Sequence, residues 1–370
     1  MQSSPSPTNP QWWQQQTGPP QSPAPSWVAA DPAKASTAPP SAAEDWWARL
    51  KSTREPPTPP QVTPQRGAGA AEALDIRALL HPTEGSRLAI ALTVSLVVFG
   101  IAGIEIAASA GLPALLGIVV ALAALGGSVW LSLQIARSRL LGGAVQVSQS
   151  SLPELQAVFD QVRARLDYHQ QVDVYVANKV DAGSIMTSYL GTRIILIEGG
   201  LVAELLKEQQ YAELTFLIGR HLGQLKAKHQ RLQWILIVIT AVDSLKFLSL
   251  FLAPYIRATV KSGDQIAAAC CGDIRATAWM MNRLLVGKEL GPQLDVRGVL
   301  DQAVTVRSRI LPRLAQMFQY QPHTTNRYLN LLAFFSRTAP DQIEAWRATL
   351  DPATAKRLTA VLNTANSYWW

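Results

Sequence analysis

Two long apolar runs dominate the pattern of hydrophobic and polar positions, and they predict a pair of membrane-spanning helices. Residues 88–110 carry one charge, Glu105, and residues 115–135 carry none. Each run has about the 20 residues that a helix needs to cross a bilayer. Only residues 111–113 separate the runs, and their Gly-Leu-Pro sequence suits a tight turn. We therefore expect a transmembrane helical hairpin over residues 87–139. The alternative, two buried core helices, is weaker because nothing else in the chain is large enough to surround them.

Basic residues at both ends of the hairpin predict its orientation. Arg87 precedes the first apolar run, and Arg137 and Arg139 follow the second. Since Lys and Arg favour the cytoplasmic side of membrane proteins, both ends are expected in the cytoplasm and the turn on the far side. The expected location is the cytoplasmic (inner) membrane, as a multi-pass protein whose tail and main domain are cytoplasmic. Glu105 lies near the turn, where its carboxylate is expected to reach the far headgroups rather than act within the membrane.

After the hairpin, helical and strand-like periods alternate before helices take over. Residues 152–169 have apolar positions at helical spacing, residues 172–178 alternate like a strand, and residues 192–201 form a β-rich run that ends in two glycines. Two helices follow, the second from about residue 210 to residue 230. From Ile256 onward the chain is helical. The expected fold class is α+β, mainly helical with a small β-sheet.

Two later segments differ from the rest of the domain in their predicted roles. The apolar stretch 232–255 contains Asp243 and Lys246, which is more typical of an interfacial or packed helix than of a third span. Residues 337–370 are expected to form a C-terminal helical extension, in which Asp351 is a good N-cap.

The first 72 residues are rich in Pro, Ser and Gln and have no apolar period, so they are predicted to form a disordered tail. Tryptophans are unusual in such a tail, and here they occur in the pairs Trp12-Trp13 and Trp46-Trp47. An indole combines a large apolar face with one hydrogen-bond donor, which suits docking onto a protein groove or a membrane interface. The alternative is a passive tether with incidental aromatic residues.

Composition and charge narrow the function classes. The 370 residues include only two cysteines, the adjacent Cys270 and Cys271, which excludes a disulfide-stapled secreted scaffold. The net charge is +7; residues 1–87 are neutral overall and Glu105 adds −1, so residues 137–370 carry +8. A basic domain suits the anionic inner leaflet of a membrane. Its basic residues are dispersed and are not interleaved with stacking aromatics, so nucleic-acid binding is not expected.

Five short motifs follow the hairpin in an order typical of one protein family. They read IILIEGGL at 194–201, GRHLGQLKAKH at 219–229, YIRATVKSGDQIAAACCGD at 255–273, LLVGKEL at 284–290 and QPHTTNR at 321–327. Together with the two-span hairpin, they resemble the HtpX-like family of membrane-anchored zinc metalloproteases, relatives of the CAAX prenyl proteases. The resemblance covers about residues 85–335. It implies a metalloprotease-like, gluzincin-type domain over residues 150–336.

The resemblance also implies a zinc site, and this chain lacks its residues. The family has two histidines one helical turn apart, a glutamate general base beside the first, and a distal glutamate as third ligand. The first and second histidine positions hold Arg220 and Gln224, the general-base position holds His221, and the third-ligand position holds Val260. A guanidinium has no lone pair to donate, Gln offers only a neutral amide oxygen, and Val offers nothing. We therefore expect no catalytic residues, no metal ligands and no cofactor.

One family position is retained. Asp264 matches the aspartate that orients the first histidine ligand in active relatives. We hypothesise that an Arg220–Asp264 ion pair fills the space left by zinc and joins the two helices. The alternative is that Arg220 points to solvent.

These observations favour a catalytically inactive pseudopeptidase that acts by binding or scaffolding a protein partner, through either the tail or the vestigial cleft. The membrane bilayer is its other expected partner. An alternative is an active membrane metalloendopeptidase with a non-standard metal site, which would need ligands that the sequence does not offer. A third possibility is a structural membrane protein whose cleft is unused.

Overall fold

The structure is a computed structural model that describes residues 73–178, 180, 184–189, 192–232, 248–317 and 319–365. The predicted tail, with its paired tryptophans Trp12, Trp13, Trp46 and Trp47, and all but the ends of the apolar stretch 232–252 lie outside the described residues.

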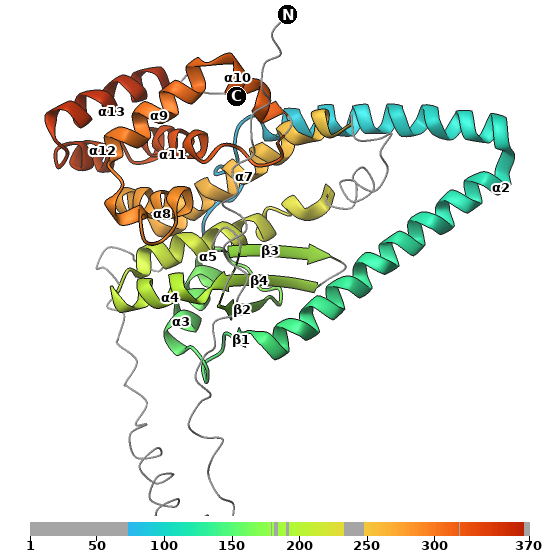
Figure 1. Cartoon of the computed structure of the whole chain (residues 1–370), viewed down its shortest axis with the longest axis horizontal. Helices are drawn as coiled ribbons and strands as arrows, with labels where there is room; N and C mark the ends of the chain where they lie inside the picture. The colour runs from blue at the N-terminus through green and yellow to red at the C-terminus, as the bar shows by residue number, and fades with distance from the viewer. Residues whose placement is uncertain are drawn as a thin grey trace, which may run out of the picture. The chain divides into compact units, whose positions relative to one another are not determined.

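The membrane hairpin is built from one broken helix, α2, which covers Glu84–Gly143. Gly111 interrupts it with φ 73° and ψ −177°, a backbone conformation that glycine adopts without the steric cost of a Cβ. The two arms, Glu84–Ser109 and Leu116–Leu140, are long and apolar enough to cross a membrane, which confirms the prediction of two apolar helices. They meet at a corner remote from the rest of the fold (Figure 1).

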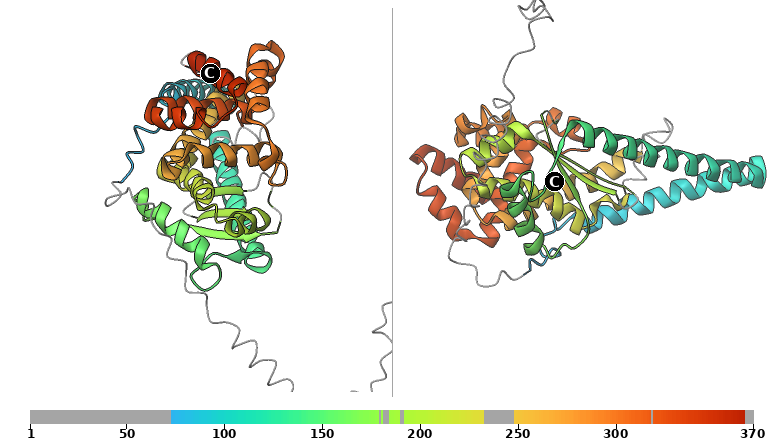
Figure 2. Two further views of the ribbon diagram at one scale, coloured as in Figure 1. Left: turned by 90° about the vertical axis from the view of Figure 1, so that its left-hand side faces the viewer. Right: turned by 90° about the horizontal axis from the view of Figure 1, so that it is seen from below.

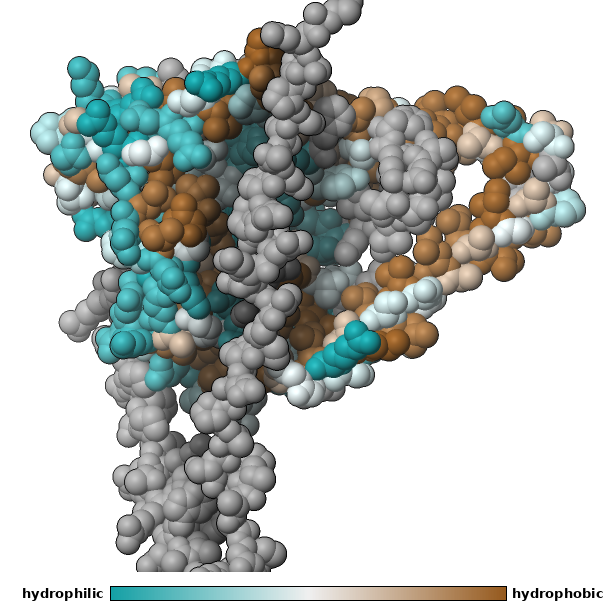
Figure 3. All heavy atoms as spheres, in the orientation of Figure 1, coloured by the Kyte–Doolittle hydropathy of each residue, from teal (hydrophilic) through white to brown (hydrophobic). Residues whose placement is uncertain are grey.

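Most of the apolar surface of the hairpin is not covered by protein. Ile104 is 72% exposed in the first arm, and none of the most apolar stretch of the second arm is buried. Hydrophobic residues occupy most of the surface of both arms (Figure 3). The first half of the first arm packs on the domain: Ala91 belongs to a small buried cluster with Leu252 and Tyr255, and Phe99 packs against this cluster. An exposed apolar surface of this extent is typical of a membrane-contacting segment.

A four-stranded mixed sheet follows the hairpin. Its strands are β1 (Val145–Gln146), β2 (Asp173–Ala177), β3 (Ser184–Tyr189) and β4 (Thr192–Glu198). They are arranged in the order β1-β2-β4-β3; β2 and β4 are parallel, whereas β3 and β1 are antiparallel to their neighbours. The strands expected over 172–178 and 192–201 correspond to β2 and β4. The second ends earlier than expected, because Gly199 begins a helix instead of closing the strand.

The remaining elements are helical, as predicted. They are α3 (Pro153–Arg165), α4 (Gly199–Lys207), α5 (Tyr211–Lys226), the 3-10 helix η5 (His229–Leu232), α7 (Ser249–Cys271), α8 (Ile274–Val286), the 3-10 helix η7 (Gly291–Gln293), α9 (Val296–Ser308), α10 (Ile310–Met317), α11 (Thr324–Thr338), α12 (Pro340–Arg347) and α13 (Pro352–Ala365). The helix expected to reach residue 230 ends at Lys226, because Lys228 adopts a positive φ of 59°.

Helices α5 and α7 cross at the centre of the domain, between the sheet and the C-terminal helices (Figures 1 and 2). Glycines allow this close approach. A Cβ on Gly223 of α5 would lie 2.4 Å from Cγ2 of Ile266, and one on Gly263 of α7 would lie 2.7 Å from Cγ of Gln224. The family-like motifs on these two helices are therefore brought face to face.

The C-terminal helices belong to the same hydrophobic core as the rest of the domain. Ile343 and Trp346 of α12 and Leu358 of α13 are buried in the cluster that also contains the core of α5. The boundary expected between residues 336 and 337 falls inside α11. Asp351 caps α13 as predicted: its Oδ1 accepts hydrogen bonds from the backbone amides of residues 353 and 354.

Polar contacts tie each end of the hairpin to a different part of the domain. Glu84, the first residue of α2, accepts a hydrogen bond from the hydroxyl of Ser262 on α7. Its Oε1 also lies 3.0 Å from Nε2 of His229. At the other end, Nη2 of Arg137 lies 2.6 Å from Oδ2 of Asp173 on β2. The hairpin is therefore held at two separate points.

Candidate functional site

The predicted ion pair between α5 and α7 is present. Nε of Arg220 lies 3.3 Å from Oδ1 of Asp264, whose side chain is completely buried. Arg220 is largely buried as well, so the alternative in which it points to solvent is wrong. Its contact is an ion pair without a hydrogen bond at Nε, since that atom has no hydrogen-bond partner.

A second arginine, which the sequence did not single out, binds the same carboxylate more closely. Arg327 on α11 donates two hydrogen bonds to Asp264, from Nε at 2.7 Å and from Nη2 at 2.8 Å. This bidentate geometry is the strong form of an arginine–carboxylate contact. The only signal for it was the position of Arg327 at the end of the QPHTTNR motif, in which its partner was not identified.

The resulting cluster holds two guanidinium groups against one carboxylate. The pKa of Arg220 is lowered to about 10, mainly by burial and also by the positive charge of Arg327, while Asp264 opposes both effects. Arg220 therefore stays protonated at neutral pH. Its charge lies at the position where the resemblance implies the first zinc ligand.

His221, at the general-base position, faces the sheet. Its Nε2 lies 2.8 Å from the hydroxyl of Ser184 on β3, and its Nδ1 has no hydrogen-bond partner. Burial lowers the pKa of His221 to about 3, and the charges of Arg220 and Arg327 act in the same direction. The imidazole is therefore neutral at physiological pH.

These positions share one cleft of about 580 Å³. Its walls come from β3, α5, η5, α7, α8, α11 and the segment that precedes α11. All four degenerate motif positions line it: Arg220, His221, Gln224 and Val260. The sequence-predicted site residues are thus brought together, and the edge of β3 forms part of the same wall through Ser184, Ile185 and Met186.

The residues of this cleft do not fit a zinc ion. A divalent cation at the motif would lie beside two permanently charged guanidinium groups, and the carboxylate between them, Asp264, is already bound by both. Gln224 and Val260 supply no strong ligand. Within the described ranges, no group of three or more His, Cys, Asp and Glu side chains is close enough to hold a metal ion.

No known protein family, curated protein or solved structure matches this chain. The structure itself shows a mostly helical domain with a small mixed sheet and two apolar N-terminal helices. The gluzincin-type fold and the HtpX-like assignment remain predictions from the motifs.

The lowered pKa values of two buried histidines, His81 and His221, make the stability of the domain depend on pH. His81, just before α2, resembles His221: its pKa is lowered to about 3, mainly by burial and also by the charges of Lys261, Arg87 and Arg337. In the unfolded chain both groups titrate near pH 6.5. Between pH 6.5 and 5 the unfolded state therefore binds protons that the folded state does not, so the free energy of unfolding falls as the pH falls.

We expect each histidine to contribute a slope of up to about 1.4 kcal/mol per pH unit in this window. Denaturant unfolding of the full chain in detergent, measured from pH 7.5 to 5, should show it. His221→Gln should remove the contribution of one histidine to the pH dependence of the free energy of unfolding. The matched control, His169→Gln, changes an exposed histidine that pairs with Asp167 at the surface, and it should change the slope less than His221→Gln does. Equal slopes in all three proteins would show that His221 titrates normally in the fold.

Proposed function

We propose that this protein is a membrane-anchored, catalytically inactive HtpX-like pseudopeptidase that binds or scaffolds a polypeptide partner. In this proposal the hairpin crosses the cytoplasmic membrane, and the tail and main domain lie in the cytoplasm. The observation that carries the proposal is the Arg220–Asp264–Arg327 cluster, whose two arginines line the cleft at the place where the resemblance implies a metal site. In this proposal the three charged side chains hold α5, α7 and α11 together, and the cleft is available for binding.

The edge of β3 supports the idea that the cleft holds an extended segment. Among the described strands, β3 pairs only with β4, so its other edge has no strand beside it. Ile185 in this strand is 46% exposed and lines the cleft. An extended peptide can add to such an edge through backbone hydrogen bonds, while side chains enter the adjoining pocket. Loss of the metal does not remove this mode of binding.

The tail complements the cleft in this proposal. Its tryptophan pairs, Trp12-Trp13 and Trp46-Trp47, would dock onto the partner, and the tether would raise the effective concentration of the cleft at the membrane.

The test uses full-length protein purified in detergent, with β-casein as an extended polypeptide probe. We expect β-casein to bind without being cleaved, and zinc to be far below one equivalent after incubation with zinc chloride. Ile185→Asp places a charge on the β3 edge and should weaken casein binding about tenfold. The matched control is Val145→Asp, because Val145 is similarly exposed on β1 at the opposite edge of the sheet.

Two results would contradict the proposal. Near-stoichiometric zinc that a chelator removes, together with casein cleavage that the chelator stops, would favour the active metallopeptidase. If β-casein does not bind, or if both variants weaken its binding equally, the β3 edge is not the binding site.

A further inference from the structure

A second cavity, distinct from the cleft, lies where the domain meets the start of the hairpin. It has a volume of about 430 Å³ and is enclosed by the first turn of α2 and by parts of α7, α9, α10 and α11. Four cationic side chains line it: Arg87, Arg257, Lys261 and Arg307. No carboxylate is among its described lining residues. We call it the basic cavity.

The cations of the basic cavity are close enough to affect one another. Lys261 is only 3% exposed, and its pKa is lowered to about 7, mainly by burial and also by Arg87, Arg257 and Arg307, whereas the carboxylate of Asp264 acts in the opposite direction. Burial also lowers the pKa of Arg257 to about 10, and Arg87 acts in the same direction. A bound anion would relieve this mutual repulsion.

The basic cavity also contains a neutral donor without a partner. Asn330 on α11 is about nine-tenths buried, and its Oδ1 accepts a hydrogen bond from Gln265. Its Nδ2 is buried and has no hydrogen-bond partner. Because an unsatisfied buried donor is costly, this atom points to a ligand that accepts a hydrogen bond.

The position of Arg87 sets the depth of the basic cavity relative to a bilayer. Arg87 directly precedes the apolar run of the first arm, and it donates a hydrogen bond to the carbonyl of Pro254 on α7. If the arm crosses a membrane, its hydrocarbon section begins at Leu88. The basic cavity then lies at the level of the lipid headgroups.

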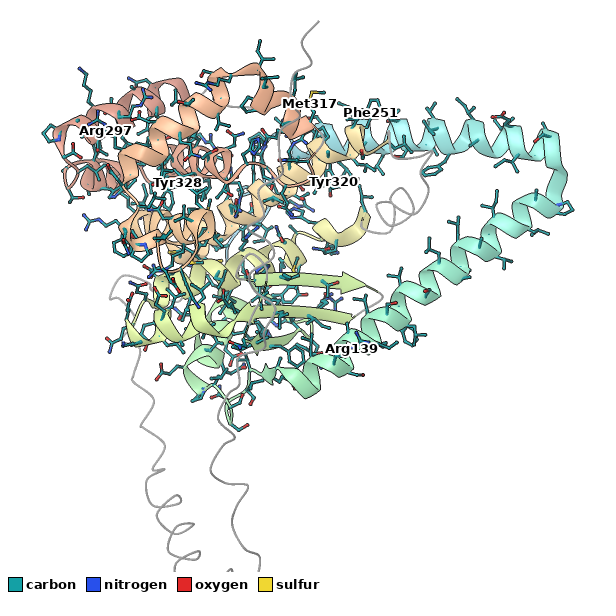
Figure 4. All side chains as sticks on the ribbon, viewed as in Figure 1. Arg139, Phe251, Arg297, Met317, Tyr320 and Tyr328 are labelled. Carbon is teal, nitrogen blue, oxygen red and sulfur yellow. The ribbon has the colours of Figure 1, made fainter. Side chains whose placement is uncertain are left out.

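An exposed apolar face adjoins the basic cavity. On α10, Ile310 and Leu311 are 72% and 78% exposed, and Leu314 and Met317 are also exposed. Met317 lines the basic cavity and lies at the end of α10 nearest the hairpin (Figure 4). Arg257 fixes this end by donating hydrogen bonds of 2.8 Å to the carbonyls of Gln316 and Gln319. Cations and exposed apolar side chains are thus combined at one place.

We propose that the basic cavity binds the phosphate group of an anionic membrane phospholipid, with the acyl chains lying against the apolar face of α10. The proposal rests on the hairpin crossing a bilayer and is independent of whether the cleft is catalytically active. The cations and the Asn330 amide match a phosphate group in charge and hydrogen bonding. The apolar residues Met317 and Leu329 beside them favour a lipid over a free inorganic phosphate.

Native mass spectrometry of the full-length protein in detergent tests this proposal. The probes are dioleoylphosphatidylglycerol, dioleoylphosphatidylcholine and inorganic phosphate. We expect an adduct of one phosphatidylglycerol at a concentration at least about tenfold lower than phosphatidylcholine requires. Inorganic phosphate should neither form the adduct nor displace the lipid at equal concentration.

Two variants locate the site. Lys261→Met keeps the side-chain volume and removes a buried charge, and Arg307→Gln changes a half-buried cation. Each should weaken phosphatidylglycerol binding about fivefold, because one cation near a lipid headgroup is lost. The matched control, Arg275→Gln, removes an equal charge from the exposed start of α8 and should have no effect. If Lys261→Met fails to fold, Arg307→Gln carries the test.

Several outcomes would overturn the proposal. Equal binding of the two lipids would exclude recognition of the anionic headgroup. Equal losses in all three variants would indicate a general charge effect instead of a site. Displacement of the lipid by equimolar inorganic phosphate would assign the basic cavity to a free anion. Carbonate extraction of membranes tests separately whether the hairpin inserts. A protein whose hairpin does not cross the bilayer would be released by carbonate.

Discussion

Asp264→Asn is expected to destabilise the domain by about 3–5 kcal/mol. The substitution leaves the buried charges of Arg220 and Arg327 without their counter-ion, and removing one partner from a buried ionic cluster typically costs this much. Thermal unfolding of the full chain in detergent should show a fall in apparent Tm of roughly 10 °C. The matched control is Asp341→Asn, at an exposed position in the first turn of α12, where a loss below about 0.5 kcal/mol is expected.

A joint replacement tests the same cluster from the opposite side. If the three charges act only in holding the helices together, changing Arg220 and Arg327 to Met and Asp264 to Leu removes all three charges of the cluster at once. The triple variant should regain most of the stability lost in Asp264→Asn, because well-packed apolar residues can replace a buried ionic cluster. A Tm for Asp264→Asn equal to that of the parent would show that the arginines do not depend on this carboxylate.

Gly223→Ala should cost about 1–3 kcal/mol by forcing α5 and α7 apart. The added Cβ would lie 2.4 Å from Cγ2 of Ile266 and 2.9 Å from its Cβ, so either Ile266 or the backbone must move. Denaturant unfolding would measure the loss. Gly298→Ala in α9 is the matched control, because no atom lies within 4 Å of the added Cβ. It should stabilise the domain by about 0.5–1 kcal/mol through helix propensity. Similar effects of both substitutions would show that the crossing of α5 and α7 is loosely packed.

The sequence predicted the elements whose physics is local. Apolar runs of membrane-spanning length, the N-cap Asp351 and the alternating strand β2 all depend on neighbouring residues, and each was found close to its expected place. The Arg220–Asp264 contact was predicted because the resemblance placed both residues at one site. Strand β3 was missed, since its sequence SIMTSY is partly polar and its pairing with β4 is a tertiary contact.

The identity of the group that binds Asp264 most closely could not be predicted either. Arg327 is 63 residues away along the chain, and no local pattern says that α11 returns to cross α7 at that carboxylate. The basic cavity is likewise formed by residues that are far apart in the sequence. Its four cations come from three helices, α2, α7 and α9, and in the sequence they are only part of a dispersed positive charge.

The two anchor points of the hairpin have a consequence for which segments can reach the cleft. Glu84 fixes the first arm to α7 and η5, and Arg137 fixes the second arm to β2, so the domain cannot swing freely on a single hinge. In the proposed membrane orientation, the entrance of the cleft would therefore be held at a constant distance from the bilayer. A polypeptide partner that emerges from the same membrane would reach the β3 edge only beyond a fixed number of residues, so the two anchor points would select binding segments by their distance from the membrane.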